Sequence, residues 1–267
     1  MMLPQLTTEQ AVAQMKFNDW NRRKDVVVLD TETTGLFGAE ICEISVIDLD
    51  GNVLFDSLVR PKNPIPPDAQ KIHGINDEMV KDAPNWLKTW KELHPILADK
   101  LVLTYNAEFD TRLLIESLEP HNDEKKWNLI DQIERDILDL EIDCVMRTYA
   151  SLIGSERWVK LSVAAGYETK HRALSDCRAT LDVIRSNYRP EFGEEELKLV
   201  QWKDELETTT RKIRYLNYRM QELNEEQVEL MQKQKKLLQR LYDNEITKDE
   251  AAATEDIGDI EDMEWPF

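Results

Sequence analysis

Two acidic residues, Asp30 and Glu32, follow directly after the apolar run 26–29. The β-branched and leucine side chains of this run predict a strand that is buried on both faces. Residues i and i+2 of a strand point to the same side, so both carboxylates project from one face. Neighbouring carboxylates in such a place repel each other unless a positive charge lies between them, which favours a divalent cation. The alternative is an acidic strand end that only turns the chain at Gly35.

Two further acids occur near the start of predicted helices. Asp110 lies in the first turn of a helix expected over residues 106–117. Asp176 lies in a helix expected over residues 171–187. Carboxylate oxygens in the absence of cysteine are ligands that suit Mg²⁺ or Mn²⁺. Two such ions about 4 Å apart would hold the attacking and the leaving oxygen of a phosphoryl displacement, with Asp30 bridging them.

His171 precedes Asp176 by five residues, a spacing that would place the two about 140° apart on one helix. We therefore expect His171 on the loop before the helix, free to turn toward the attacking water. An imidazole can accept a proton at physiological pH, so His171 is the candidate general base. The alternative is an ordinary surface histidine.

Three motifs resemble those of the DEDDh 3′–5′ exonucleases, the family of the proofreading epsilon subunit of bacterial DNA polymerase III and of exonuclease X. They are Asp30-x-Glu32-x-Thr34-Gly35, Asn106-Ala107-x-Phe109-Asp110 and His171-x-Ala173-x-x-Asp176, and Ile72-His73-Gly74-Ile75 also matches. The resemblance covers residues 24–188. It implies a ribonuclease-H-like fold, release of nucleoside monophosphates from a 3′ end, and His171 as the base. It implies four metal ligands: Asp30, Glu32, Asp110 and Asp176.

The resemblance also assigns contacts with the terminal nucleotide to the residues after the first acids, namely Thr33, Gly35 and Leu36. Phe37 is placed to stack on a base, as aromatic side chains do on single strands, or to fold back onto the core. His73 and Asn106 are expected near the cleft, where they contact the substrate or brace the site.

The rest of residues 26–190 predicts an α/β domain that follows an N-terminal helix within residues 1–25. Strands are expected over 26–30, 40–48, 53–59, 101–105 and 142–145. The turn at 49–52 predicts an antiparallel hairpin, and Asn85 is expected to cap a helix that ends near Leu97. A hairpin followed by alternating helices and strands predicts a mixed sheet flanked by helices. Residues 121–140 predict a charged helical insertion without an evident role.

Residues 194–246 predict a long helix, because neither glycine nor proline occurs between Gly193 and Gly258. Apolar residues recur there at heptad spacing, which predicts a coiled coil with Gln227 and Gln234 as selectors of register. Homodimerisation is the first interpretation. A helical hairpin bent near Asn224 and docking on another protein are the alternatives.

Residues 247–267 are acidic and poor in apolar residues, which predicts a disordered tail. The end of this tail resembles the acidic C-terminal tip of bacterial single-stranded-DNA-binding proteins, since it finishes in Trp265, Pro266 and Phe267. The resemblance implies docking on proteins that read that tip, with the terminal ring in an apolar pocket and its carboxylate on a basic residue. An autoinhibitory tail and an ordinary solvated tail are the alternatives.

The formal net charge is −19, although phosphate binding favours a basic surface. About half of this charge belongs to residues 191–267, so much of it is a property of the C-terminal segment. The apolar runs are too short for a membrane span and the N-terminus lacks a signal pattern, which predicts a cytoplasmic protein. The three cysteines, Cys42, Cys144 and Cys177, indicate buried thiols rather than a disulfide framework or a zinc site.

Together these patterns predict a DNA 3′–5′ exonuclease that uses two Mg²⁺ ions, for which Mn²⁺ can substitute, and acts on single-stranded DNA. Trimming of RNA 3′ ends is the alternative within the family, because the sequence does not show how a 2′-OH is treated. The alternative outside the enzyme class is an adaptor that competes for readers of the single-stranded-DNA-binding-protein tip.

Overall fold

The computed structural model describes residues 6–121 and 126–255, without the side chains of 242–255. The chain divides into two compact units, Met1–Trp202 and Lys203–Phe267. The five strands that the structure describes all belong to the first unit.

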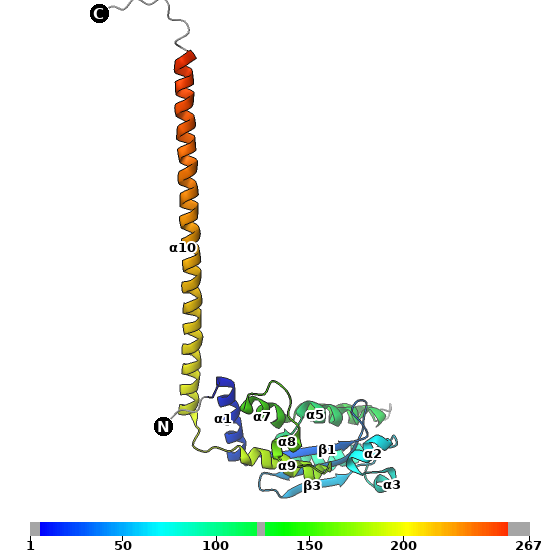
Figure 1. The fold of residues 1–267 in the computed structure, drawn as a ribbon. Coiled ribbons are helices and arrows are strands. Elements are labelled where there is room, and N and C mark those ends of the chain that lie inside the picture. Colours follow the sequence, from blue (N-terminus) through cyan, green and yellow to red (C-terminus); the bar gives the residue numbers. More distant parts are fainter. Residues whose placement is uncertain (1–5, 122–125, 256–267) are drawn as a thin grey trace, which may run out of the picture. The chain divides into compact units, whose positions relative to one another are not determined.

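The described elements, drawn in Figure 1, follow one another in this order: α1 (Thr8–Arg22), β1 (Val26–Thr33), β2 (Ile41–Asp48), β3 (Val53–Leu58), α2 (Pro67–His73), α3 (Asp77–Val80), α4 (Trp86–Leu97), β4 (Leu101–Thr104), α5 (Ala107–Glu116), a 3₁₀ turn (Glu119–His121), α6 (Trp127–Leu138), β5 (Glu141–Cys144), α7 (Val145–Ile153), α8 (Leu161–Ala165), α9 (Ala173–Ser186) and α10 (Glu194–Glu255).

The strands form one mixed sheet in the order β3-β2-β1-β4-β5. β1 and β3 both pair with β2 in the antiparallel sense, so the predicted hairpin is confirmed. β4 lies parallel to β1, and β5 lies parallel to β4. Helices cover both faces, which confirms the predicted mixed sheet flanked by helices.

The central strand β1 sends alternate side chains into two hydrophobic clusters. Val27 and Leu29 pack with apolar residues of α4, α5 and α6. Val26 and Val28 pack in the other cluster, with apolar residues of α1 and α9. Because side chains alternate along a strand, Asp30 continues the face that α9 covers.

The end of strand β1 differs from the sequence prediction. β1 continues to Thr33 rather than ending at Asp30, because its last residues still pair with β2. The register shifts between Glu32 and Thr33, a local irregularity of the kind that often re-aims side chains beside a functional site. Residues 61–67, which include four prolines, lead directly into α2, because Pro67 occupies a first-turn position where a missing N–H costs no hydrogen bond.

Helix α6, which lies in the insertion predicted over residues 121–140, contributes to the hydrophobic core although its sequence is rich in charged residues. Ile130, Ile133 and Ile137 recur at helical spacing and are buried in the cluster that also contains Leu113 and Leu114 of α5. α6 therefore completes the hydrophobic layer on one side of the sheet. Residues 122–125 of this insertion lie outside the described residues.

α10 is one helix from Glu194 to Glu255, so it continues beyond Thr247, where the composition predicted the tail to begin. Its 62 residues correspond to about 93 Å at 1.5 Å per residue. It runs without a break past Asn224, so the hairpin alternative is wrong. Among the described residues, no helix combines the length and the apolarity that crossing a bilayer requires.

Candidate active site

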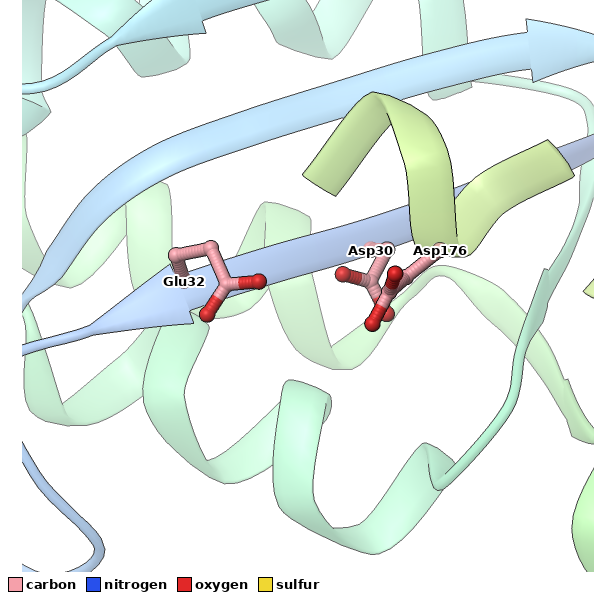
Figure 2. A group of neighbouring side chains, drawn as sticks. All are labelled: Asp30, Glu32 and Asp176. Atoms are coloured by element: carbon pink, nitrogen blue, oxygen red, sulfur yellow. The ribbon is translucent and has the colours of Figure 1, made fainter. Parts of the chain in front are cut away.

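Asp30 and Glu32 of β1 lie beside Asp176 of α9 (Figure 2). Each of the three offers a carboxylate oxygen, and these oxygens all lie within 4.8 Å of one another. We call these three residues the acidic group. The two strand residues share a face because they are two positions apart, as the sequence predicted. Asp176 joins them because α9 packs on β1 and β2.

Burial and mutual repulsion make the acidic group hard to ionise. Burial raises the pKa of Glu32 to about 8, and the charges of Asp176 and Glu43 add to this effect. Burial likewise raises the pKa of Asp30 well above its ordinary value, reinforced by the charges of Asp110 and Glu32. Burial also raises the pKa of Asp176. A group of this kind is stabilised by a bound cation, because the cation replaces the repulsion with attraction.

The donor set of the acidic group fits a hard divalent cation. All of its donors are carboxylate oxygens, which Mg²⁺ and Mn²⁺ prefer. One of them, Oδ1 of Asp176, is buried and accepts no hydrogen bond from any residue that the structure describes. A buried polar atom without a partner is uncommon in folded proteins, and an ion is one of its ordinary explanations.

Asp110 lies next to the acidic group but is not one of the three residues whose carboxylate oxygens all lie within 4.8 Å of one another. It sits in the first turn of α5, where the hydroxyl of Thr31 donates a 2.9 Å hydrogen bond to its Oδ1. Burial raises its pKa to about 7, against the opposite effect of this hydrogen bond. Its charge contributes to the raised pKa of Asp30, which places it within electrostatic reach of the group.

His171 lies on the loop before α9, as the spacing predicted. Its φ is +48°, a backbone conformation that few residues other than glycine adopt. The side chain is 56% exposed, and its Nδ1 is 4.0 Å from Oδ2 of Asp176. The ring is therefore open to solvent beside the acidic group, as a proton acceptor for an attacking water must be.

Sequence reasoning missed the ion pair that holds this end of α9. Glu43 of β2 lies opposite Glu32 in the sheet and is buried. It accepts hydrogen bonds of 3.1 and 3.0 Å from Nε of Arg172, another from Nη2 of Arg172, and one of 2.9 Å from the backbone N–H of Ala173. The sequence signal for this pair was Glu43, an acidic residue inside an apolar strand, because a buried carboxylate needs a partner for its charge. The pair fixes the backbone between His171 and Asp176.

The predicted substrate residues fall into two sets. Thr33, Gly35 and Leu36 line a hollow of about 610 Å³ together with the acidic group. Phe37 is 83% exposed, so the alternative that it folds back onto the core is wrong. Asn106 precedes α5 and lines a second, larger hollow with Phe37.

His73 lines the smaller hollow, but it is buried and both of its ring nitrogens bond within the protein. Its Nδ1 accepts the backbone N–H of Ile75 at 3.0 Å, so its Nε2 carries the proton and donates to the carbonyl of Thr33 at 3.2 Å. Gly74 permits this arrangement, because it ends α2 with a φ of +74°. Both ring nitrogens are used within the protein, which makes the bracing alternative the better interpretation.

Without divalent metal, the protein is expected to lose stability as the pH rises from about 4.5 to about 8. The pKa of Glu32 is 4.5 ordinarily and about 8 in the fold. Between these values the folded state binds the proton more tightly, so stability is complete below the lower value and falls toward the upper one. Thermal unfolding in EDTA should give a lower Tm at pH 8 than at pH 5. Glu32→Gln should reduce this difference, and an equal difference in both proteins would contradict the explanation.

Trp265, Pro266 and Phe267, which the sequence assigned to partner binding, lie outside the described residues.

Several known proteins are similar to this chain. The family described as Exonuclease (RNase_T) matches residues 27–184. An uncharacterized exonuclease, CP81, of Escherichia phage 186 is 39% identical over 177 residues, which cover 60% of this chain and 86% of the phage protein. The DNA polymerase III subunit epsilon of Pasteurella multocida is 30% identical over 173 residues, which cover 59% of this chain and 65% of that subunit. The solved structure of Exonuclease X with 5′ overhanging duplex DNA is 25% identical, covers 64% of this chain and 99% of its own, and has a TM-score of 0.44.

Proposed function

Because this chain belongs to the RNase_T exonuclease family, we propose that it removes nucleotides one at a time from the 3′ ends of DNA. The observation that supports this most strongly is the acidic group beside an exposed histidine at the mouth of a hollow. DNA is favoured over RNA because one relative is a subunit of a DNA polymerase. The product of each turn is a nucleoside monophosphate.

Asp30, Glu32 and Asp176, with Asp110 beside them, would hold two Mg²⁺ ions or Mn²⁺ in their place. Bound divalent cations supply positive charge to the phosphoryl oxygens and to the attacking and leaving oxygens. His171 accepts the proton of the attacking water, since its ring is exposed next to Asp176. Thr33, Gly35 and Leu36 hold the terminal nucleotide in the smaller hollow.

The test is digestion of a 5′-labelled single strand of DNA, with a matched duplex and an RNA of the same sequence. With Mg²⁺ we expect a ladder that shortens from the 3′ end and releases mononucleotides, and with EDTA no cleavage. Digestion of RNA but not DNA would favour the RNA-trimming alternative. If both nucleic acids survive Mg²⁺ and Mn²⁺ intact, the enzymatic proposal fails and the adaptor alternative gains support.

We further propose that α10 pairs with α10 of a second copy. In the part of α10 whose side chains are described, the apolar residues at heptad positions after Trp202 are exposed: Leu206, Ile213, Leu216, Met220, Leu223, Leu230, Leu237 and Leu241. A helix that exposes such a stripe gains stability when a second helix covers it. In a parallel pair in register, Gln227 and Gln234 would each meet their counterparts, where amides can hydrogen-bond.

Changing Leu216 and Leu230 together to lysine is expected to convert the dimer to a monomer in sedimentation experiments. Each lysine would place a charge in the apolar seam, while lysine itself remains a good helix former. The matched control is Tyr218→Lys with Gln232→Lys, which adds the same charges on the opposite face of the helix. Cleavage of short oligonucleotides should not change in either variant. A wild-type protein that sediments as a monomer would contradict the proposal.

For residues 265–267 we propose the role in partner binding that the sequence suggested. Residues 265–267 would dock on proteins that read the single-stranded-DNA-binding-protein tip, because aromatic rings beside acidic residues suit an apolar pocket rimmed by basic residues. An autoinhibitory tail would instead compete with substrate, so truncation would then increase cleavage.

A further inference from the structure

Apolar side chains on α10 form a stripe that is symmetric about the level of Tyr218. They lie two, five and twelve residues before Tyr218 and again two, five and twelve residues after it, and all are between 52% and 67% exposed: Leu206, Ile213, Leu216, Met220, Leu223 and Leu230. Polar residues lie nine residues away on both sides, namely Thr209 and Gln227. Such a stripe matches its own reverse, so a second copy of α10 that runs in the opposite direction covers it with side chains of the same kind.

Charged residues follow one edge of this stripe at intervals of seven: Glu205, Lys212, Arg219, Glu226 and Lys233. In an antiparallel pair of helices this edge faces the same edge of the other copy. Glu205 then meets Lys233, Lys212 meets Glu226, and the twofold axis repeats both pairs. None of these four is ion-paired with another residue that the structure describes. Arg219 meets its own copy, but its guanidinium is already paired with Glu222 at 2.6 Å.

A parallel pair offers these charges no partner. In that arrangement each residue of the charged edge faces the residue five places further along the other copy. The residues at those places are uncharged: Thr210, Asn217, Asn224, Met231 and Leu238. An exposed ion pair contributes little by itself, but four of them stabilise the antiparallel pair and none stabilises the parallel one. The charges of this edge therefore favour the antiparallel direction.

The end of the stripe favours the same direction. In the antiparallel pair Gln234 faces Trp202 of the other copy, and the indole N–H can donate to the amide oxygen. Trp202 is 64% exposed, so its ring is open to such a partner. A parallel pair would instead place two Trp202 rings in one layer, which overpacks the seam. Like charges meet near this end in either direction, Lys198 with Arg240 or with Lys203, so they do not decide between the two.

We propose that two copies of α10 pair in opposite directions, centred at the level of Tyr218. This inference rests on the pairing of α10 proposed above and is independent of the exonuclease activity. The part of α10 after Leu241 in one copy then runs beside the start of α10 in the other, at Glu194. That start belongs to the unit Met1–Trp202, so the C-terminal segment of each copy reaches the nuclease unit of the other. A protein captured by residues 265–267 is thereby brought to the nuclease of the second copy.

Distances between nitroxide spin labels test the direction of the pair. In the antiparallel pair, labels on Lys235→Cys are separated by about 34 residues of helix, which is about 50 Å at 1.5 Å per residue. In a parallel pair they lie across two helix diameters, about 20 Å. The matched control is Gln221→Cys, near the centre, whose labels should lie about 20 Å apart in both arrangements and so report the dimer. The wild-type chain treated with the same reagent accounts for Cys144, since Cys42 and Cys177 are buried.

A separation of about 50 Å for Lys235→Cys supports the proposal. About 20 Å for both variants would refute it and leave a parallel dimer. About 40 or 60 Å would place the centre one heptad away from Tyr218 and overturn the proposed register. If neither variant gives a distance between copies and the protein sediments as a monomer, the pairing of α10 fails as a whole. Cleavage of DNA by the same preparations reports the exonuclease function separately.

Charge reversal gives a second test of direction. Glu205→Lys alone and Lys233→Glu alone should each raise the Kd of the dimer about threefold to tenfold at low salt, because each turns two attractive pairs into repulsive ones. The double variant should return Kd to about the wild-type value, since both pairs are restored with their charges exchanged. In a parallel pair residues 205 and 233 lie about 42 Å apart, so the two effects would combine independently and overturn the proposal. The matched control joins Glu207→Lys with Lys236→Glu, outside the stripe, and should show no such compensation.

Discussion

Replacing Asp30 with asparagine is expected to lower kcat for DNA hydrolysis by about 1,000-fold or more, because the lost charge stabilisation is of several kcal/mol. Asparagine has nearly the same shape as aspartate, so the packing of β1 should persist while the acidic group loses one charge. The measurement is the rate at which a 5′-labelled single strand shortens at saturating Mg²⁺. Without metal, the variant should unfold at a higher temperature than the wild type, since removing one like charge relieves repulsion among buried acids.

Metal binding gives a second readout for the same variant. For the wild type, Mg²⁺ at about 100 times its Kd should raise Tm by about 5–10 °C. Asp30→Asn should lose most of this increase. The control is Asp50→Asn in the exposed turn between β2 and β3, which should retain both the activity and the metal-dependent increase. An Asp30→Asn protein that still cleaves DNA at the wild-type rate would remove the basis for the proposed site.

Replacing His171 with glutamine is expected to lower kcat by about 100- to 10,000-fold, the usual contribution of a positioned general base. The side chain is 56% exposed, so the stability should change little. The Mg²⁺-dependent increase in Tm should remain, because the acids that would hold the metal are intact. His171 and Asp30 variants are thereby distinguished by calorimetry as well as by rate.

The matched control for His171→Gln is His94→Gln on α4, where the ring stacks on Trp90 outside the site. That change should leave kcat as it is. A loss of metal-dependent stabilisation in His171→Gln would show instead that the imidazole is a metal ligand, and a decrease in kcat of less than tenfold would exclude its role as the base.

The sequence by itself determined the local features on which the site depends. The apolar run before Asp30 made β1 a buried strand, and the two-residue period placed Glu32 on the same face. The spacing of His171 and Asp176 placed the histidine before the helix rather than on it. Asn85 caps α4 as expected, accepting the N–H of Lys88 at 3.1 Å. Each of these follows from covalent geometry and from interactions within a few residues, which the sequence states directly.

The three motifs also predicted the family and the ribonuclease-H-like fold, and both predictions are confirmed. Their order and spacing identified residues that are distant in the chain without describing how they meet. The end of β1 was a local error, because the residues after Asp30 still pair with β2.

Only the tertiary structure decided which side chains meet. Asp176 reaches Asp30 because the apolar face of α9 packs on the sheet, and the buried Glu43 fixes the start of that helix through Arg172. The exposure of Phe37 and the larger hollow with Trp158 likewise depend on segments that are far apart in the sequence. Such contacts are selected by the summed burial of many residues and by the pairing of buried charges. No short stretch of sequence contains that sum. The motifs therefore identified the residues of the site, but only the tertiary structure shows how these residues come together.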